Sequence, residues 1–564
     1  MRSFQIFILI LLFFVSCKKQ EIQQPIKRGL LMENAMVVSA REEASKIGSD
    51  ILKKGGNAFD AMAATHIALA VAYPYAGNIG GGGFMVYRKA NGEFGSLDFR
   101  EKAPLAATKN MYLDKEGNII PDKSTLGAMA VGVPGSVAGI FAVHKKFGSL
   151  SIEDIIQPSI NLAKQGVVVT KKQEEKIKKY QPFFPKANQD SIIFDIHWKE
   201  NDTIKYPALA ETLKRIMLNG KDEFYKGETA KRLVKFIQDN GGIITKEDLE
   251  RYDVKWRTPL SFKYDDLNII SMSPPSSGGV CLAQIMKMIE PYQLDNFGHN
   301  SLKAIQVLTE AERRAYADRS YYLGDPDFVT NPLQKLIDED YLKNRMSTFS
   351  FNDATPSEKV SHGNVQVMES DETTHYSIVD QFGNAVSVTT TINGAYGSKL
   401  YCSDLGFFLN NEMDDFSSKP GAPNMFGLIG AEANSIAPEK RMLSSMTPTI
   451  VEKNGELFMV VGSPGGSTII TSVLQTILNV HEYNMSMQAA VDVPRFHHQW
   501  LPDRIVFEPN KFEKKLIEQL NKLNYTTVEI ENIITSKVDG ILILGDKTLE
   551  GGADYRGDDT AVGF

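Results

Sequence analysis

Cysteine and histidine are scarce in this chain of 564 residues, which contains 3 cysteines and 9 histidines. A protein of this length buries enough core to be stable without disulfide bonds, so we expect Cys281 and Cys402 to be free thiols in the core. The histidines show no metal-binding spacing. The one adjacent pair, His497 and His498, would point to opposite faces of a strand. We therefore expect no metal site and no cofactor.

The sequence also lacks a run of basic residues. Its 62 basic and 69 acidic residues are interspersed and give a net charge of −7. Because nucleic-acid-binding proteins carry clustered lysine and arginine, this pattern argues against a nucleic-acid partner. The apolar share of 42% is typical of a globular protein. The length would allow three or four average domains, but large layers of helix and sheet can share a single core.

Long apolar runs are absent except at the N-terminus, where one extends from Phe4 to Val15 and is interrupted only by Gln5. A helix of this length, about twelve residues, spans about 18 Å, which is short of the roughly 30 Å hydrocarbon core of a membrane. The basic residue Arg2 precedes the run. These features favour a cleaved signal over a spanning helix.

The end of this run resembles a bacterial lipoprotein cleavage site, because the small residue Ser16 directly precedes Cys17. We predict that residues 1–16 are a signal peptide, that Cys17 is lipidated, and that residues 17–30 form a polar tether. Plain secretion and an uncleaved anchor are the alternatives. The protein is expected in the cell envelope, facing the periplasm.

Local patterns predict several buried elements in the first half of the chain. Asn57 is placed to cap a nearly apolar, Ala-rich helix that we expect to pack on a sheet. The glycine run 80–83 is followed by a strand and by no Lys-Ser/Thr pair, so it indicates close backbone packing and not a phosphate loop. The pattern predicts helices over 41–54, 58–72, 151–166 and 300–318, a strand over 84–88, and a strand, turn and helix start over 126–139.

The segment from Thr373 to Thr391 reads as a hairpin, because two β-rich runs flank a turn with Gly383 at its end. A three-residue loop, 381–383, with glycine in the left-handed conformation would close it. Thr373 then faces Thr391, with Cβ atoms roughly 4.5 to 5.5 Å apart. A loop one residue longer would shift this pairing by one position. Thr-Thr pairs are common in strands, so the hairpin alone does not establish a site.

Three further motifs follow this hairpin in order. They are Leu409-Asn410-Asn411-Glu412-Met413-Asp414-Asp415-Phe416, Leu443-Ser444-Ser445-Met446-Thr447-Pro448-Thr449, and Gly462-Ser463-Pro464-Gly465-Gly466-Ser467. With these motifs the sequence resembles the γ-glutamyltransferases, or γ-glutamyl transpeptidases, of the N-terminal-nucleophile hydrolase superfamily. The resemblance extends from about residue 35 to the C-terminus.

This resemblance implies the fold and a maturation step. The expected fold is an α/β (α+β) protein with a four-layer αββα sandwich. Self-cleavage between Glu372 and Thr373 is expected to leave a large subunit, residues 31–372, and a small subunit, residues 373–564, joined in one fold. The polar, non-periodic stretch 353–372 before Thr373 agrees with a segment that must be released.

Cleavage would also create the catalytic base. A threonine hydroxyl is a weak nucleophile, and the freed α-amine of Thr373, a group whose ordinary pKa is near 8, lies a few bonds from its own Oγ. No serine-hydrolase elbow is present to supply another nucleophile. By the resemblance, Thr391 hydrogen-bonds the nucleophile. Gly465 and Gly466 precede an apolar helical run, so their N–H groups could form an oxyanion hole.

A γ-glutamyl donor carries a free α-carboxylate and a free α-ammonium group. The resemblance assigns the carboxylate to Arg100, Ser444 and Ser445, and guanidinium suits it because its planar fork can donate two parallel hydrogen bonds. It assigns the ammonium group to Asn393, Glu412 and Asp415. Phe426 occupies a lid position often filled by Tyr in bacterial members, which predicts a looser lid and better access for water.

The leading hypothesis is a self-cleaving γ-glutamyltransferase and hydrolase that acts on glutathione and other γ-glutamyl amides and passes the glutamyl group to water, an amino acid or a peptide. A related amidase for glutaryl or poly-γ-glutamate substrates is the first alternative. An envelope protein that binds γ-glutamyl peptides without cleaving them is the second, and the presence of Thr373 and Thr391 disfavours it.

Overall fold

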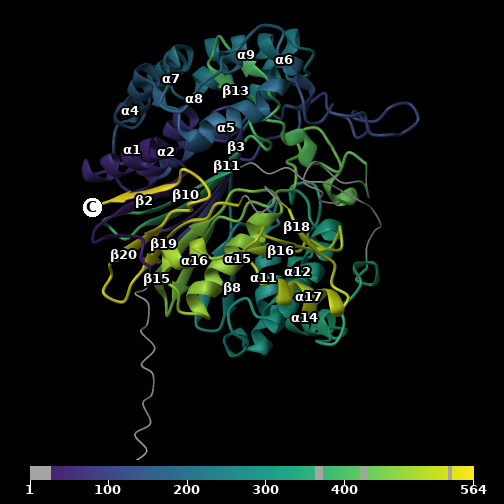
Figure 1. Ribbon diagram of the computed structural model, residues 1–564. Coiled ribbons are helices and arrows are strands. Elements are labelled where there is room, and N and C mark those ends of the chain that lie inside the picture. The colour runs from purple at the N-terminus through teal and green to yellow at the C-terminus, as the bar shows by residue number, and fades with distance from the viewer. Residues whose placement is uncertain (1–26, 362–372, 420–421, 423–429, 531–535) are drawn as a thin grey trace, which may run out of the picture.

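The structure is a computed structural model that describes residues 27–361, 373–419, 422, 430–530 and 536–564. Two seven-stranded sheets lie face to face, and every strand pairing within them is antiparallel (Figure 1). The first sheet has the order β1 (Leu30–Met32), β20 (Leu549–Gly552), β19 (Asp539–Ile543), β15 (Glu456–Gly462), β14 (Thr449–Lys453), β9 (Leu267–Ser271) and β8 (Leu260–Tyr264). The second has the order β21 (Thr560–Gly563), β2 (Met36–Ser39), β10 (Thr374–Val379), β11 (Ala385–Thr391), β3 (Gly82–Arg88), β4 (Phe94–Asp98) and β7 (Lys255–Arg257).

Helices cover the outer face of each sheet (Figure 1). Over the second sheet lie α1 (Glu42–Lys53), α2 (Ala58–Ala72), α3 (Ser136–Phe147), α4 (Ile152–Gln165), α5 (Lys171–Tyr180), α6 (Phe184–Ala187), α7 (Pro207–Asn219), α8 (Lys221–Tyr225) and α9 (Glu228–Asp239). Below the first sheet lie α11 (Gly278–Ile289), α12 (Leu302–Tyr322), α14 (Glu339–Met346), α15 (Thr468–His481), α16 (Met487–Asp492) and α17 (Lys514–Lys522). The expected four-layer αββα sandwich is confirmed.

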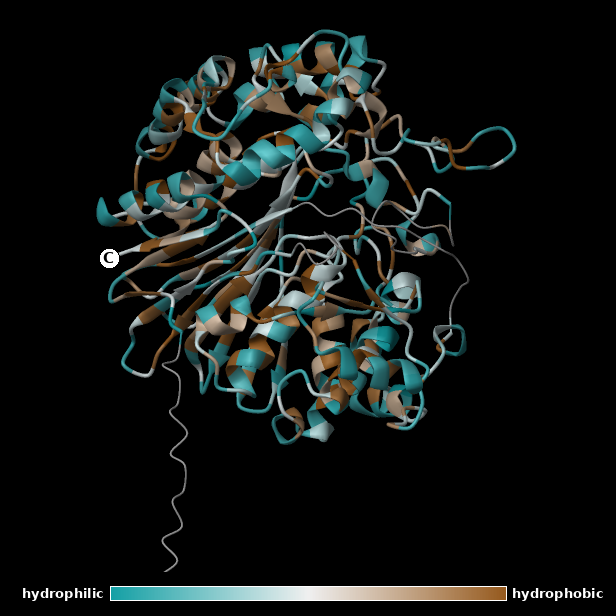
Figure 2. Cartoon of the chain, viewed as in Figure 1, coloured by the Kyte–Doolittle hydropathy of each residue, from teal (hydrophilic) through white to brown (hydrophobic). Residues whose placement is uncertain are grey.

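The remaining elements are short. The helices are α10 (Lys246–Glu250) and α13 (Leu333–Leu336), and the strands are β5 (Val167–Val168), β6 (Thr203–Ile204), β12 (Tyr401–Cys402), β13 (Phe407–Phe408), β16 (Phe496–His497), β17 (Ile505–Phe507) and β18 (Thr527–Glu529). Hydrophobic residues concentrate on the strands and on the helix faces turned toward them (Figure 2). One large apolar cluster joins the second sheet to the helices that cover it. Another includes side chains from both sheets and from the helices below the first sheet. Such burial is the main driving force for this layered arrangement.

The predicted helices are present with small shifts at their ends. Helix α2 has the predicted bounds, is buried along its whole length and packs on the second sheet. Its N-terminus has a capping box, in which the Asn57 side chain accepts from the Asp60 N–H and the Asp60 carboxylate accepts from the Asn57 N–H. The capping signal read from the sequence therefore located this helix correctly.

The prediction of a strand within 126–139 was wrong. This segment forms a short 3₁₀ turn, Ala128–Ala130, and then an extended stretch in which Val133 makes an isolated bridge with Lys102. Pro134 has no N–H to donate to a sheet, so the ladder does not extend beyond this bridge. The predicted helix start is correct, because α3 begins at Ser136.

The hairpin of β10 and β11 has the predicted loop and register. Thr374 pairs with Thr390, and the pairing continues to Val379 and Ala385. Gly383 has a φ of 89°, the left-handed conformation that the three-residue loop requires. The ends of the two strands therefore bring Thr373 beside Thr391.

The glycine run before β3 is closely packed, as predicted, and it lies against this hairpin. A Cβ atom added to Gly81 would lie 2.1 Å from the carbonyl oxygen of Thr391, so only glycine fits there. Cys281 and Cys402 are buried free cysteines. No helix within the described ranges is both long and apolar enough to cross a membrane. Cys17, Glu372 and Phe426 lie outside the described residues.

Candidate active site

A small pocket opens at the ends of β10 and β11, between the two sheets. Its volume is about 20 Å³, which is room for about one water molecule. Its lining combines residues from both predicted subunits: Arg100, Thr373, Thr391, Asn393, Asp415, Ser444, Ser445, Met446, Gly466 and Ile469. The structure thus gathers most of the predicted site residues around Thr373, and Glu412 and Gly465 adjoin them.

Thr373 and Thr391 are both almost completely buried, with exposed fractions of 5% and 2%. Thr391 Oγ1 accepts the backbone N–H of Asn393 at 2.7 Å. Asn393 has a φ of 69°, and its side-chain amide donates to the carbonyl oxygen of Asn411 at 2.9 Å. These bonds fix the turn after β11, so the hydroxyl of Thr391 is held next to the proposed nucleophile.

Arg100 lies two residues beyond β4, and carboxyl groups surround its guanidinium. Nη1 lies 2.6 Å from Glu412 Oε2 and 3.7 Å from Glu101 Oε2, and Nη2 lies 2.5 Å from Asp415 Oδ2. The side chains of Arg100, Glu101 and Glu412 are at most 1% exposed. Even so, the Nε–H of Arg100 and both side-chain oxygens of Glu101 have no hydrogen-bond partner among the described residues. Buried charges that are this poorly hydrogen-bonded are costly and indicate a ligand site.

Burial also changes the protonation of this cluster. It raises the pKa of Glu101 to about 8, although the charge of Arg100 opposes the change. Burial raises the pKa of Glu412 well above its ordinary value, again against the charge of Arg100. For Arg100, burial lowers the pKa, but the charges of Glu412, Asp415 and Glu101 outweigh it and raise the pKa above the ordinary value. The site therefore combines one permanent positive charge with at least one carboxyl group, that of Glu101, which retains its proton at neutral pH.

Ser444 and Ser445 form the opposite wall of the pocket. The Ser444 N–H donates to the carbonyl oxygen of Pro275 at 2.9 Å, and the Ser444 carbonyl accepts from both the N–H and the hydroxyl of Ser277. Ser444 Oγ accepts the N–H of Met446 at 3.1 Å. These bonds leave the Ser444 O–H without an acceptor among the described residues, so it can donate into the pocket.

Gly465 and Gly466 form the turn into α15, as the sequence predicted. Both have positive φ angles, 112° and 36°. A Cβ atom on Gly465 would lie 2.5 Å from Ser536 Oγ, so the turn requires glycine. Within the described part of the chain, no hydrogen bond uses the N–H of either glycine. Free N–H groups in a turn before a helix can bind an anion.

Among the described residues, no imidazole takes the place of a catalytic base beside Thr373. The closest histidine along β10, His375, is buried, and burial lowers its pKa to about 3. Its Nδ1 and Nε2 lie 2.9 Å and 3.1 Å from the hydroxyls of Thr389 and Ser377. A neutral imidazole with both nitrogens bonded in this way supports the packing of β10.

Several residues at this site carry no recognisable signal in the sequence. Met446 and Ile469 are apolar lining residues, and Glu101 looks like an ordinary charge at a strand end. Asp414 reads as a surface position, but it is 5% exposed and accepts the Ser124 hydroxyl at 2.6 Å. The adjacency of Glu101 to Arg100 is the one cue in the sequence that could have identified it.

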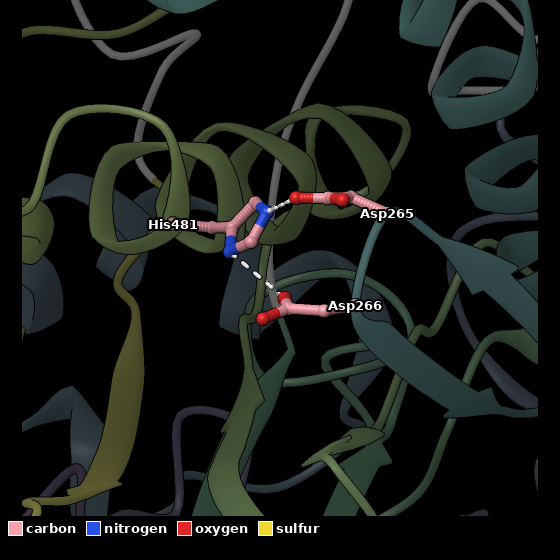
Figure 3. A group of neighbouring side chains, drawn as sticks. All are labelled: Asp265, Asp266 and His481. Atoms are coloured by element: carbon pink, nitrogen blue, oxygen red, sulfur yellow. Dashed lines mark hydrogen bonds and ion pairs between the residues drawn. The ribbon is translucent and has the colours of Figure 1, made fainter.

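A separate group of possible metal ligands lies at the β8–β9 turn and the end of α15 (Figure 3). His481 Nε2 lies 3.1 Å from Asp265 and its Nδ1 lies 3.9 Å from Asp266, so the two ring nitrogens face different carboxylates. Lys453 pairs with Asp266 at 3.1 Å. Because Lys453 already pairs with Asp266 and the His481 ring contacts both aspartates, these residues are better described as a surface ion-pair cluster than as a metal site. None of them lines the pocket at Thr373.

Comparison with known proteins agrees with this geometry. The family model described as Gamma-glutamyltranspeptidase matches residues 44–564. The glutathione hydrolase proenzyme of Escherichia coli (strain K12) is 42% identical over 551 residues, which cover 96% of this chain and 94% of that protein. The glutathione hydrolase proenzyme of Pseudomonas sp. (strain A14) is 47% identical over 493 residues, which cover 87% and 86% of the two chains.

Solved structures are similar to this chain as well. The crystal structure of cephalosporin acylase from Bacillus halodurans has a TM-score of 0.83 and covers 98% of this chain and 99% of its own, but its 22% identity supports only the fold. A chain of Helicobacter pylori gamma-glutamyltranspeptidase is 45% identical, has a TM-score of 0.57, and covers 61% of this chain and 99% of its own. From the family model and the two curated relatives we conclude that the chain belongs to the γ-glutamyltranspeptidase family of N-terminal-nucleophile hydrolases.

Proposed function

We propose that this protein is a self-cleaving enzyme that transfers the γ-glutamyl group of glutathione and other γ-glutamyl amides through an ester on Thr373. The observation that carries the proposal is the cluster of buried, poorly hydrogen-bonded charges of both signs beside two paired threonines. A donor with one free carboxylate and one free ammonium group matches such a cluster. The curated relatives are named glutathione hydrolase proenzymes, which supports both the donor and the maturation step.

Maturation begins when Thr373 Oγ attacks the carbonyl carbon of Glu372. The C–N bond breaks, the acyl group passes to oxygen as an ester, and water hydrolyses the ester to release the carboxylate of Glu372 and the free amine of Thr373. The products are an N-terminal fragment of residues 17–372, which consists of the tether and the large subunit 31–372, and the small subunit, residues 373–564. The Helicobacter pylori chain matches 61% of this one, about the share that residues 31–372 make up.

Catalysis then uses the new amine as base. It takes the proton from Thr373 Oγ as the oxygen attacks the γ-carbonyl carbon, and it returns the proton to the leaving amine. The carbonyl oxygen becomes negative in the transition state, and the N–H groups of Gly465 and Gly466 are suited to stabilise it. Water or an acceptor amine next attacks the γ-glutamyl ester and frees Thr373.

Donor binding requires an exchange of partners at Arg100. Its guanidinium is paired with Glu412 and Asp415, so the incoming α-carboxylate replaces one of these carboxylates. The α-ammonium group of the donor then pairs with the released carboxylate, aided by the amide of Asn393. Ser444 and Ser445 donate to the same α-carboxylate from the other wall.

We further propose that the enzyme works in the cell envelope, facing the periplasm. The apolar run before Cys17 and the polar residues after it support a lipoprotein signal, residues 1–16, and a tether that begins at Cys17. The predicted end of the tether at residue 30 is too late, because Arg28 and Gly29 bond to Glu550 and Leu30 belongs to β1. Lipidation of Cys17 would make the protein membrane-attached through its acyl chains. A single lipid chain binds only marginally, so stable attachment would need more than one.

The deciding experiment combines gel electrophoresis with a chromogenic assay. The purified wild type is expected to run as two fragments, with Thr373 as the first residue of the smaller one, and to release p-nitroaniline from γ-glutamyl-p-nitroanilide faster when glycylglycine is added. The Thr373→Ala variant is the matched control and should remain one inactive chain near 62.6 kDa. An uncut wild type, or faster turnover of glutaryl-p-nitroanilide than of the γ-glutamyl amide, would contradict the proposal.

A further inference from the structure

A second buried arginine, Arg319, contacts Ser445, which lines this pocket. It lies in the last turn of α12 and is 3% exposed. Its Nε donates to Ser277 Oγ at 2.8 Å, and its Nη2 donates to Ser445 Oγ at 3.1 Å. Within the described residues, no carboxylate lies within 4.0 Å of its guanidinium, whereas Arg313 and Arg314 on the same helix pair with Glu310. Burying a cation without a counter-ion is costly, so this charge calls for a functional explanation.

The hydrogen bond to Ser445 has a directional consequence. Guanidinium can only donate, so Ser445 Oγ must accept, and its own O–H is left to donate elsewhere. Among the described residues that O–H has no acceptor, and Ser445 lines the pocket. The same logic holds at Ser277, whose oxygen accepts from Arg319 and whose O–H donates to the carbonyl of Ser444 at 2.7 Å. Arg319 therefore sets the direction of two hydroxyls and holds the Ser444–Ser445 wall in place.

The charges around the two arginines differ. Arg100 forms close ion pairs with Glu412 and Asp415, which compensate its positive charge. For Arg319, burial lowers the pKa below the ordinary arginine value, and the charge of Asp415 is among the influences that oppose this change. The positive charge of Arg319, which has no carboxylate within ion-pair distance among the described residues, thus lies behind Ser445, and a hydroxyl polarised by a cation is a strong donor to an anion.

We propose that Arg319 is a positioning residue that selects donors by their α-carboxylate, because it turns the Ser445 hydroxyl toward that group and supplies the buried positive charge behind it. The inference rests on the proposed γ-glutamyl function. It predicts that removing Arg319 weakens recognition of the carboxylate and leaves recognition of the α-ammonium group unchanged.

Three p-nitroanilides separate these effects. The γ-glutamyl amide has both groups, the glutaryl amide lacks the α-ammonium group, and the 4-aminobutanoyl amide lacks the α-carboxylate. In Arg319→Met, kcat/KM for the first two is expected to fall on the order of 10- to 100-fold, the size of a lost hydrogen bond to a charged group, mainly through KM. The kcat/KM for the 4-aminobutanoyl amide should change less than about threefold, because this amide has no carboxylate to accept the Ser445 hydrogen bond. Each amide is also measured as a competitive inhibitor of γ-glutamyl turnover, so that slow turnover does not hide binding.

Three further variants make the test specific. Arg319→Lys keeps the charge but cannot reach both serines with one fork, so it should recover part of the selectivity. In a Ser445→Ala background, Arg319→Met should cause a smaller loss than in the wild type, because its effect passes through the Ser445 hydroxyl. Arg314→Met is the control, since it removes another buried arginine of α12 and should leave the ratio of γ-glutamyl to 4-aminobutanoyl turnover unchanged.

An equal loss on all three amides, or an unchanged ratio between carboxylate-bearing and carboxylate-free donors, would overturn the inference. If Arg319→Met fails to mature, the ratio in Arg319→Lys decides the matter, since a purely structural role predicts no change in selectivity there. Failure of the proposed function itself would be visible separately, as a wild type that neither splits at Thr373 nor cleaves the γ-glutamyl amide.

Discussion

Replacing Glu101 with glutamine tests the electrostatics of the buried cluster. Burial raises the pKa of Glu101 from 4.5 to about 8. Because the folded pKa lies above the unfolded one, the stability from this group is complete below pH 4.5 and is lost as the pH rises through 8. At about 1.36 kcal/mol per pKa unit, the loss between pH 5 and pH 9 is at most about 4 kcal/mol. Glu101 shares Arg100 with Glu412, so the measured loss should lie below this limit.

The assay is urea unfolding at pH 5, 7 and 9 in the Thr373→Ala background, where the protein remains a single chain. The parent should lose stability toward pH 9, and Glu101→Gln should show a flatter dependence. Glu456→Gln is the control, because Glu456 forms a surface pair with Lys547, with side chains 74% and 70% exposed, and such pairs contribute little. Parallel pH curves for Glu101→Gln and its parent would refute the assignment of a buried, protonated carboxyl at this position.

Three other variants address the remaining roles. Arg100→Ala should weaken donor binding by about 2 to 5 kcal/mol, because it removes the buried charge that pairs with the donor carboxylate. An unchanged KM for γ-glutamyl-p-nitroanilide would exclude Arg100 from donor binding. Gly465→Ala would place a Cβ atom 2.5 Å from Ser536 Oγ and distort the proposed oxyanion hole. We therefore expect kcat to fall about 10²- to 10³-fold. An unchanged kcat in a correctly matured variant would contradict the oxyanion role of Gly465. Cys17→Ala should move the protein from the detergent phase to the aqueous phase in a Triton X-114 partition, and persistent detergent partitioning would argue against lipidation.

The parts of the fold that could be predicted from the sequence are those set by local rules. Gly383 fixes the hairpin loop, and the alternation of strand residues then determines that Thr373 meets Thr391. Asn57 defines the start of α2 through its side-chain bonds to the first turn. The failure at 126–139 has a local cause too, since glycines and Pro134 interrupt an otherwise strand-like apolar run.

The charged part of the site could not be read in the same way. Glu101 and Glu412 are distant in sequence and meet only because β4 and the turn at Glu412–Asp415 converge on Arg100. Arg319 lies on a long helix that also contains Arg313 and Arg314. Nothing in the sequence distinguishes Arg319, which has no acidic partner among the described residues, from the two arginines that pair with Glu310. Tertiary packing alone sets these partners, which explains why family resemblance was needed to identify Arg100 and gave no role to Arg319.

The positions of these charges also bear on how a γ-glutamyl donor would be oriented. Asp415 lines one part of the pocket, and Ser445, whose hydroxyl accepts from Arg319, lines another, so an acidic group and a cation-backed hydroxyl occupy different positions in the wall. A head group with one carboxylate and one ammonium is favoured in one orientation there and disfavoured when reversed. Because the γ-carbonyl is tethered to that head group by a short chain, fixing the head group also fixes the distance to Thr373 Oγ. An amide that lacks either charged group is not held in this position. We therefore expect it to have a lower kcat as well as a higher KM.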